Sequence, residues 1–136
     1  MAILNDVLGA VVDMMEDEAL GLYANVVIGP LPPDNGIAVA YSSGAPEGTS
    51  MDKGMAWEMD LTLNAKHSDQ ETALSTLADI HAALTRTKTY PRTDDYQITN
   101  IETLSGPSYL DREENETAQW LYGSALRVKF FYFGGN

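Results

Sequence analysis

The last apolar run of the chain, residues 119–133, constrains the fold more than any other segment. Successive side chains of a β-strand point to opposite faces of a sheet, so the run divides into two rows. One row is mostly apolar and holds Trp120, Tyr122, Leu126, Val128, Phe130 and Tyr132. The other row mixes two cations with apolar residues: Leu121, Ala125, Arg127, Lys129, Phe131 and Phe133. We expect either a fully central strand or one whose second row is covered by a neighbouring subunit.

A second segment, residues 55–63, alternates strictly between apolar and polar positions. Its odd positions are Met55, Trp57, Met59, Leu61 and Leu63, and its even positions are Ala56, Glu58, Asp60 and Thr62. This pattern is typical of an antiparallel sheet with one face packed and the other in water.

Two segments have helical spacing. Residues 3–15 carry an apolar stripe, with Gly21 as a stop beyond it. In the second helix, Ser68 and Glu71 have the spacing of a capping box, and Pro91 ends any continuation. Its apolar face holds Ala73, Leu74, Leu77, Ile80, His81 and Leu84.

The remaining strands are shorter and separated by loops. Residues 23–28 and 37–42 flank a proline-rich reversing loop in which Asn35 and Gly36 favour positive φ. A long loop is expected over residues 43–53, and a polar connection over residues 105–117. Between them, residues 96–104 form a strand with a bulge near Thr99 and Asn100.

These elements predict one α+β domain over residues 1–136, in the order α-β-β-β-α-β-β. All strand links except the one through the second helix resemble hairpins. We therefore expect a single, mostly antiparallel sheet of about five strands with two helices packed on one face.

The charge balance limits the partners of the chain. Twenty acidic residues against eight basic ones give a net charge of −12, which repels phosphate backbones and argues against general nucleic-acid binding. No segment is apolar enough to cross a membrane, and the first residues lack the basic segment of a secretory signal. A cytoplasmic protein is expected. Without cysteine there is no disulfide or thiolate site.

The sequence contains no recognisable catalytic or cofactor motif, and we expect neither an enzyme nor a bound metal or cofactor. His81 lies on an apolar helix face and is expected to be hydrogen-bonded in the interior, whereas His67 precedes a helix. An EF-hand beginning at Asp111 fails, because Glu116 replaces the required glycine and Tyr122 the final glutamate.

Three stretches in this order carry a family resemblance: LPPDNGIAVAYSSG at residues 31–44, TALSTLADIHAALTRTKTYPRTDDYQITNIET at residues 72–103 and YGSALRVKFFYF at residues 122–133. Together with the order of elements, they make the chain similar to the tail-terminator proteins of long-tailed bacteriophages. These are also called tail-completion or minor capsid proteins. The resemblance spans nearly the whole chain as a pattern of elements and spacings.

The resemblance implies a virion structural protein that forms a homo-oligomeric ring, commonly a hexamer, on the last ring of the tail tube. The ring stops tube polymerisation and offers a docking face to the head connector or neck protein. It implies assembly in the host cytoplasm, then a place in the virion, where DNA passes through without specific binding. The family offers no catalytic residue.

Two sets of residues are expected to serve that role. The subunit interface would use Trp120, Phe130, Phe131 and Phe133, since large aromatic side chains are favoured at interfaces. One of two loops would face the channel or the tube: an acidic loop with Asp111, Glu113, Glu114 and Glu116, or the loop at residues 43–53.

Two alternatives stay open at this stage. One is a head-completion or neck connector protein of a phage, since such proteins share much of the pattern. The other is a small cytoplasmic α+β ligand-binding or enzymatic domain. It predicts a deep pocket with converging polar groups, for instance around His81.

Overall fold

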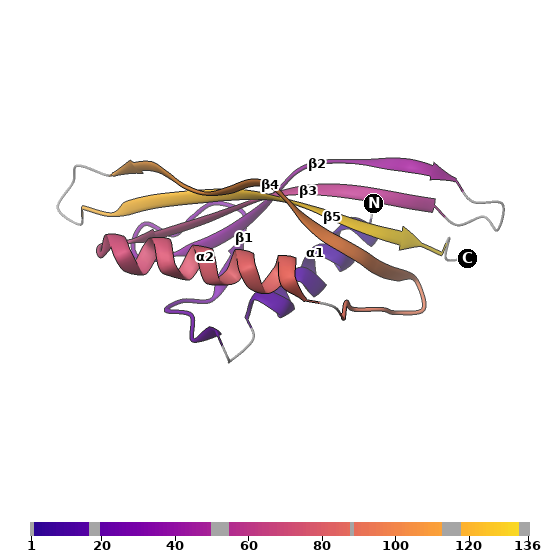
Figure 1. Ribbon diagram of the computed structural model, residues 1–136, viewed down its shortest axis with the longest axis horizontal. Helices are drawn as coiled ribbons and strands as arrows, with labels where there is room; N and C mark the ends of the chain where they lie inside the picture. Colours follow the sequence, from indigo (N-terminus) through magenta and orange to yellow (C-terminus); the bar gives the residue numbers. More distant parts are fainter. Residues whose placement is uncertain (1, 17–19, 50–54, 88, 113–117, 134–136) are drawn as a thin grey trace.

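The computed structural model describes residues 2–16, 20–49, 55–87, 89–112 and 118–133 (Figure 1). Its elements are α1 (Ala2–Met15), β1 (Val26–Ile28), β2 (Ile37–Thr49), β3 (Met55–His67), α2 (Gln70–Arg86), β4 (Tyr96–Arg112) and β5 (Trp120–Tyr132). This confirms the predicted order and the α+β class. Both helices lie on one side of the sheet, α2 along one half and α1 nearer the middle (Figure 1).

The sheet has five strands in the order β1-β2-β3-β5-β4. β5 is central, with antiparallel partners on both sides, and β4 forms one edge. β3 and β4 are therefore parallel to each other with β5 between them, and α2 makes the crossover that such a pair requires. As predicted, the link through the second helix is not a hairpin.

The link between the first two strands was predicted as a hairpin, and this is wrong: β1 pairs with β2 in parallel. β1 has only three residues, about 10 Å. The eight residues from 29 to 36 can span up to about 27 Å, which is enough to return beside so short a strand. Asn35 has the expected positive φ, at 44°.

The long strands replace two predicted loops. Residues 43–49 belong to β2 and pair with β3, and residues 105–112 belong to β4 and pair with β5. Small and polar residues are accommodated there through several shifts of register, which bulges allow. The predicted bulge near Thr99 is confirmed as a shift between Ile98 and Asn100. As a result β2, β3 and β5 continue past both helices at one end of the molecule (Figure 1).

The start of α2 also differs from its prediction. The N-cap is Asp69, and no side chain in the described part of the chain caps the helix, so the capping box predicted for Ser68 and Glu71 is wrong. The amide of Ser68 donates instead to the side-chain oxygen of Asn35, at 3.1 Å. A contact distant in sequence has replaced the local one.

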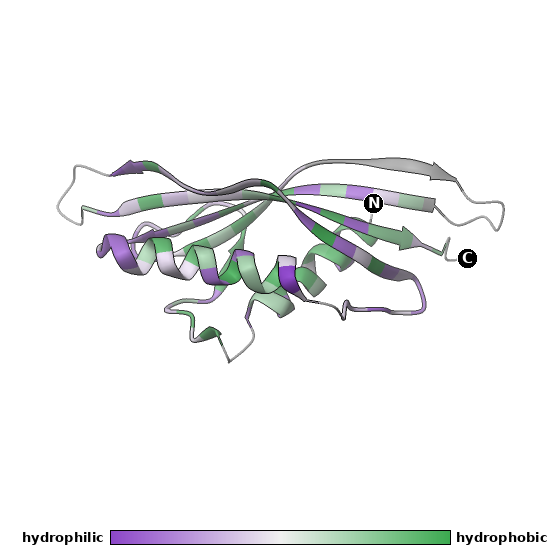
Figure 2. Cartoon of the chain, in the orientation of Figure 1, coloured by the Kyte–Doolittle hydropathy of each residue, from purple (hydrophilic) through white to green (hydrophobic). Residues whose placement is uncertain are grey.

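The core lies between the helices and the inner face of the sheet. Its largest fully buried side chains are Met15, Ile37, Met59, Leu61, Leu63, Leu77, Ile80, Leu84, Ile98, Ile101, Leu126 and Phe130. Burial of each such side chain contributes roughly 1.5–3 kcal/mol. α1 is apolar along most of its length, whereas α2 alternates between apolar and polar stretches (Figure 2). The two rows of β5 therefore face opposite sides of the sheet. The even-numbered residues face the helices, and the odd-numbered residues face away from them.

Candidate assembly surfaces

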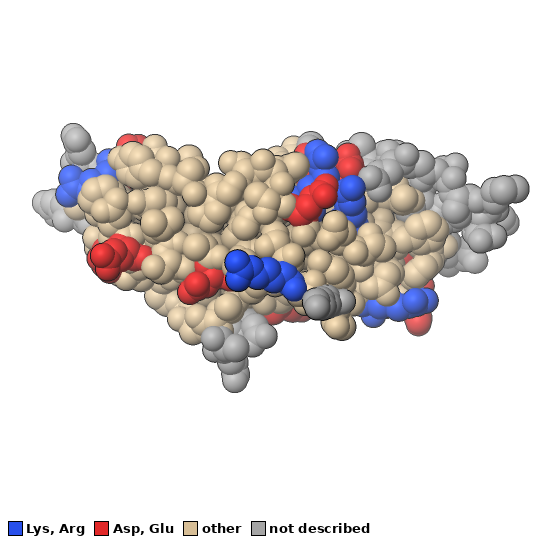
Figure 3. All heavy atoms as spheres, viewed as in Figure 1, with Lys and Arg blue, Asp and Glu red and all other residues tan. Residues whose placement is uncertain are grey.

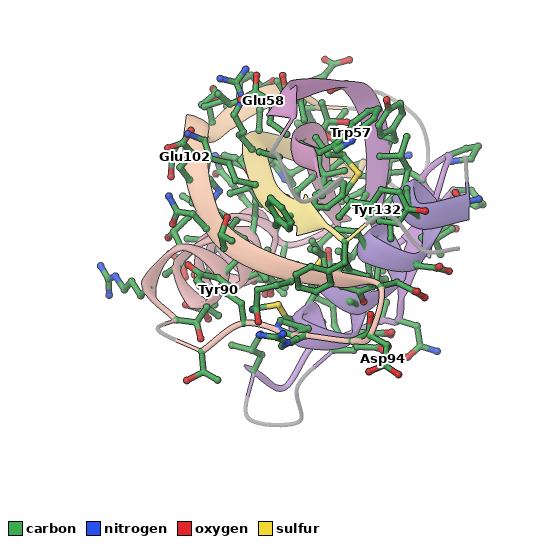
Figure 4. All side chains as sticks on the ribbon, turned by 90° about the vertical axis from the view of Figure 1, so that its right-hand side faces the viewer. Trp57, Glu58, Tyr90, Asp94, Glu102 and Tyr132 are labelled. Carbon is green, nitrogen blue, oxygen red and sulfur yellow. The ribbon has the colours of Figure 1, made fainter. Side chains whose placement is uncertain are left out.

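Five charged side chains form a cluster on the face of the sheet that is turned away from the helices. Asp60 and Arg127 face each other across β3 and β5, with 2.8 Å between Arg127 Nε and Asp60 Oδ1 and 3.2 Å between Nη2 and Oδ2. Glu58 lies 3.8 Å from Arg127 Nε, and Lys129 Nζ lies 3.5 Å from Glu102. Glu58 and Glu102 lie on the outer side of the curved sheet, and Trp57 on its inner side (Figure 4).

This charged cluster is largely compensated within the chain. Three carboxylates meet two cations, and the hydrogen bond to Asp60, followed by the nearby acidic groups, raises the pKa of Arg127. On the face drawn in Figure 3, charged side chains occur in separate groups on a mostly uncharged surface. The acidic side chains of the described residues do not form one continuous surface on that face.

One end of β5 carries a partly exposed aromatic group. The rings of Phe131 and Phe133 are 5.5 Å apart, and the guanidinium of Arg92 lies 5.1 Å from the centre of the Phe133 ring. The amide of Phe133 donates to the carbonyl of Asp95. Both phenylalanines are half-buried, so part of each side chain remains exposed on the isolated chain.

The other end of β5 contributes to what we name the distal hairpin, residues 104–112 with residues 120–124. The ring of Tyr109 lies 6.1 Å from that of Trp120 and 5.8 Å from that of Tyr122. Arg112 places its guanidinium 5.0 Å from the centre of the Trp120 ring. Three large apolar side chains are exposed here: Leu104 at 44%, Tyr109 at 52% and Leu110 at 52%.

The predicted interface residues are therefore not brought together in one patch. Phe130 is only 1% exposed and stacks near Trp57 in the interior, so it supports the core and offers no surface to a partner. Trp120 and Phe131 lie near opposite ends of a strand of 13 residues, roughly 40 Å long. Two separate regions result, one at each end of β5.

Of the predicted acidic loop, Asp111 is exposed at the end of β4, and its carboxylate accepts a hydrogen bond from the amide of Arg112. Glu113, Glu114 and Glu116 lie outside the described residues, as do residues 50–53 of the alternative loop. The exposed Tyr109 and Leu110 were missed, because residues 105–117 were interpreted as a polar connection. The adjacent Tyr-Leu pair was the signal available there.

His81 on α2 is hydrogen-bonded to both β4 and β5. It is 7% exposed, with Ser124 Oγ at 3.1 Å from Nδ1 and Thr103 Oγ1 at 2.7 Å from Nε2. This agrees with the hydrogen-bonded interior histidine that was expected. His67 is half-buried against the edge of the Tyr23 ring, and its Nδ1 accepts from the amide of Asp69.

Two further findings concern only the part of the chain that the structure describes. No three His, Asp or Glu side chains converge to hold a metal ion there. Neither of its helices is long and apolar enough to span a membrane.

No family model matches the sequence, and a comparison with curated protein sequences finds no match. A solved structure entitled "Virion of native gene transfer agent (GTA) particle" contains a matching chain, with a TM-score of 0.60 at 17% identity. The two chains share a fold. The match covers 92% of this chain and 97% of the other, so the likeness extends over essentially the whole of both.

Proposed function

We propose that this chain is a structural protein of a phage-like virion, which closes the end of a tail tube as a ring. The observation that carries the proposal is the shared fold: the matching chain comes from a virion, and the match leaves almost no part of either chain unpaired. A whole-chain likeness supports a common role better than a shared motif would. Fold analogy alone does not define a function, so the surfaces supply the second argument.

The surfaces suit a cyclic assembly. A closed ring built from identical subunits by head-to-tail contacts needs two different patches on each subunit. The distal hairpin and the end with Phe131 and Phe133 are two such patches, both partly apolar and near opposite ends of β5. Exposed apolar and aromatic side chains of this kind are typical of interaction sites.

In this arrangement the ring leaves a passage for DNA without binding it. The cations of the outer face are already compensated by Asp60, Glu58 and Glu102, so that face offers few free positive charges to phosphates. We place Asp111 and the acidic segment after it toward the channel or the tube.

Electron microscopy of particles assembled without this protein tests the role. Overlong tails are expected if the protein ends tube polymerisation. Tails of normal length that are not attached to heads would instead favour the neck connector, and normal particles would contradict both roles. Light scattering over a range of concentrations tests the ring: we expect a discrete oligomer, with a hexamer as the most natural size.

A further inference from the structure

A shallow pocket lies between α1 and the segment that leads into β4. Its volume is about 460 Å³, within the range of ligand pockets, and its polar lining includes Asn5, Asp6, Asp13, Asp95 and Tyr96. Asp6 and Asp13 are seven residues apart, two helical turns, and therefore share one face of α1.

The floor of the pocket is made of small residues. Gly9 and Ala10 lie between the two aspartates on the helix, and a Cβ added at Gly9 would meet nothing within 4 Å. The space above this turn of α1 is therefore open. A side chain or a small molecule that enters it would lie between the carboxylates of Asp6 and Asp13.

The carboxylates of Asp6, Asp13 and Asp95 have no cationic partner within the described part of the chain, in contrast to Asp60 on the outer face. Asp13 also lies in the last turn of α1, where the helix dipole disfavours an anion. Three acidic groups therefore line this pocket without a compensating charge from the described residues.

Tyr96 supplies a second and independent observation. The residue is only 5% exposed, yet its hydroxyl makes no hydrogen bond to any described residue. Since no fully buried side-chain oxygen of the described residues lacks a partner, this hydroxyl reaches the solvent of the pocket. Burial, together with the charges of Asp6 and Asp13, raises the pKa of Tyr96. An unused polar atom thus points to the same space as the carboxylates.

The chemistry of this lining selects an organic cation. The three carboxylates are too widely spaced to converge on one metal ion, as the absence of a metal cluster among the described residues also indicates. A planar guanidinium has five N–H donors and can bind several acceptors at once. We propose that this pocket receives a cationic side chain of a partner protein, arginine above all.

That side chain can come from a second copy of this chain or from another protein. Arg86 is exposed in the last turn of α2 and makes no ion pair within the described residues, so it is a suitable donor from a second copy. The proposal about the pocket does not depend on the role of the protein in a virion.

The test uses the intact, isotope-labelled protein and Nα-acetyl-arginine methylamide as the probe, followed by nuclear magnetic resonance. We expect saturable shifts confined to the amides of Asp6, Asp13, Asp95 and Tyr96. The citrulline analogue has nearly the same shape without the charge, and it should bind about tenfold more weakly or not at all.

Four variants locate the site. Asp6→Asn with Asp13→Asn should weaken binding about tenfold, and Tyr96→Phe should weaken it to a smaller extent. Gly9→Leu keeps every charge but fills the pocket, and it should abolish binding without a clash. The matched control is Asp34→Asn, an exposed aspartate outside the pocket, which should leave binding unchanged.

Three results would overturn the proposal. They are equal binding of the citrulline analogue, an equal loss in Asp34→Asn, and displacement of the probe by calcium chloride at equimolar concentration. A second experiment, in which the protein concentration is raised without the probe, identifies the source of the cationic side chain. If the same amides shift as concentration rises, and this is lost in Arg86→Ser, a second copy supplies the cation. If they do not shift while the probe binds, another protein supplies it.

Discussion

His81 Nε2 lies 2.7 Å from Thr103 Oγ1, so that a single buried imidazole ties α2 to the edge strand β4. Its other nitrogen contacts Ser124 of β5 at 3.1 Å. The helix and two strands therefore meet at one titratable group. Burial lowers the pKa of His81, because the charged form loses its hydration in the interior.

This histidine should make stability depend on pH. In the unfolded chain the imidazole binds a proton near pH 6.5, and in the folded chain only at lower pH. The unfolded state therefore binds more protons in that window, and the free energy of unfolding falls as the pH drops below about 6.5. Urea unfolding at pH 7.5 and 5.5 should show a smaller pH-dependent loss in His81→Gln than in the wild type.

The carboxylates titrate in both proteins, so the difference between them isolates His81. His67→Gln, which changes the other histidine, is the matched control and should retain the wild-type pH dependence. An identical loss in His81→Gln and the wild type would contradict the prediction.

Tyr23 should stabilise the loop before β2 and show its effect at high pH. Its hydroxyl lies 2.9 Å from the carbonyl of Lys66 and 3.0 Å from that of Gly36, and burial raises its pKa to about 12. Because the unfolded tyrosine ionises near pH 10, its contribution is complete below that pH and is lost as the pH rises toward 12.

Removal of this hydroxyl in Tyr23→Phe should lower the free energy of unfolding by about 1 kcal/mol at neutral pH. The loss is measured by urea unfolding, and the ionisation by absorbance at alkaline pH. Tyr41→Phe, at an exposed position, serves as the control and should change stability little. Equal stability of Tyr23→Phe and the wild type would show that the two carbonyls find other donors.

The sequence pattern predicted those features of the fold that depend on neighbouring residues in the chain. The two rows of β5 follow from the period of two, which fixes Leu126 and Val128 inward and Arg127 outward whatever the neighbours are. The parallel pairing of β1 was not predictable in this way. It depends on contacts that are distant in sequence, such as that of Tyr23 with Lys66, 43 residues away.

The same distinction holds for the candidate sites. Aromatic residues of β5 were visible as candidates, yet the sequence could not show that Phe130 lies in the core while Trp120 joins Tyr109. The acidic pocket was not foreseen, because α1 and Asp95 are distant in sequence. The sequence shows that Asp6 and Asp13 lie on one face of a helix with Gly9 between them. Only the structure shows that Tyr96 lies beside this face and forms a pocket with it.

Gly123 should be required by the packing of the distal hairpin. A Cβ at this position would lie 2.6 Å from Leu110 Cδ1 and 2.7 Å from Asn64 Oδ1. Leu110 is half exposed and can move, so Gly123→Ala should cost about 1 kcal/mol, at the lower end for overpacking. Gly106→Ala, where an added Cβ meets nothing within 4 Å, is the control. Denaturant unfolding measures both, and an equal effect would contradict the role of this contact.

The distal hairpin should also carry a large part of the binding energy between subunits. Leu104 and Leu110 are exposed on the isolated chain, and covering them in an assembly would remove apolar surface from water. Leu104→Ser with Leu110→Ser should therefore weaken self-association by about 2 kcal/mol, roughly 30-fold, while the circular dichroism spectrum stays native. Sedimentation equilibrium measures the association constant. Leu74→Ser makes the same chemical change at an exposed position of α2 and should leave association unchanged. If Leu74→Ser weakened association while the hairpin variant did not, the subunits would meet through the helices, and the two ends of β5 would be free for other virion proteins.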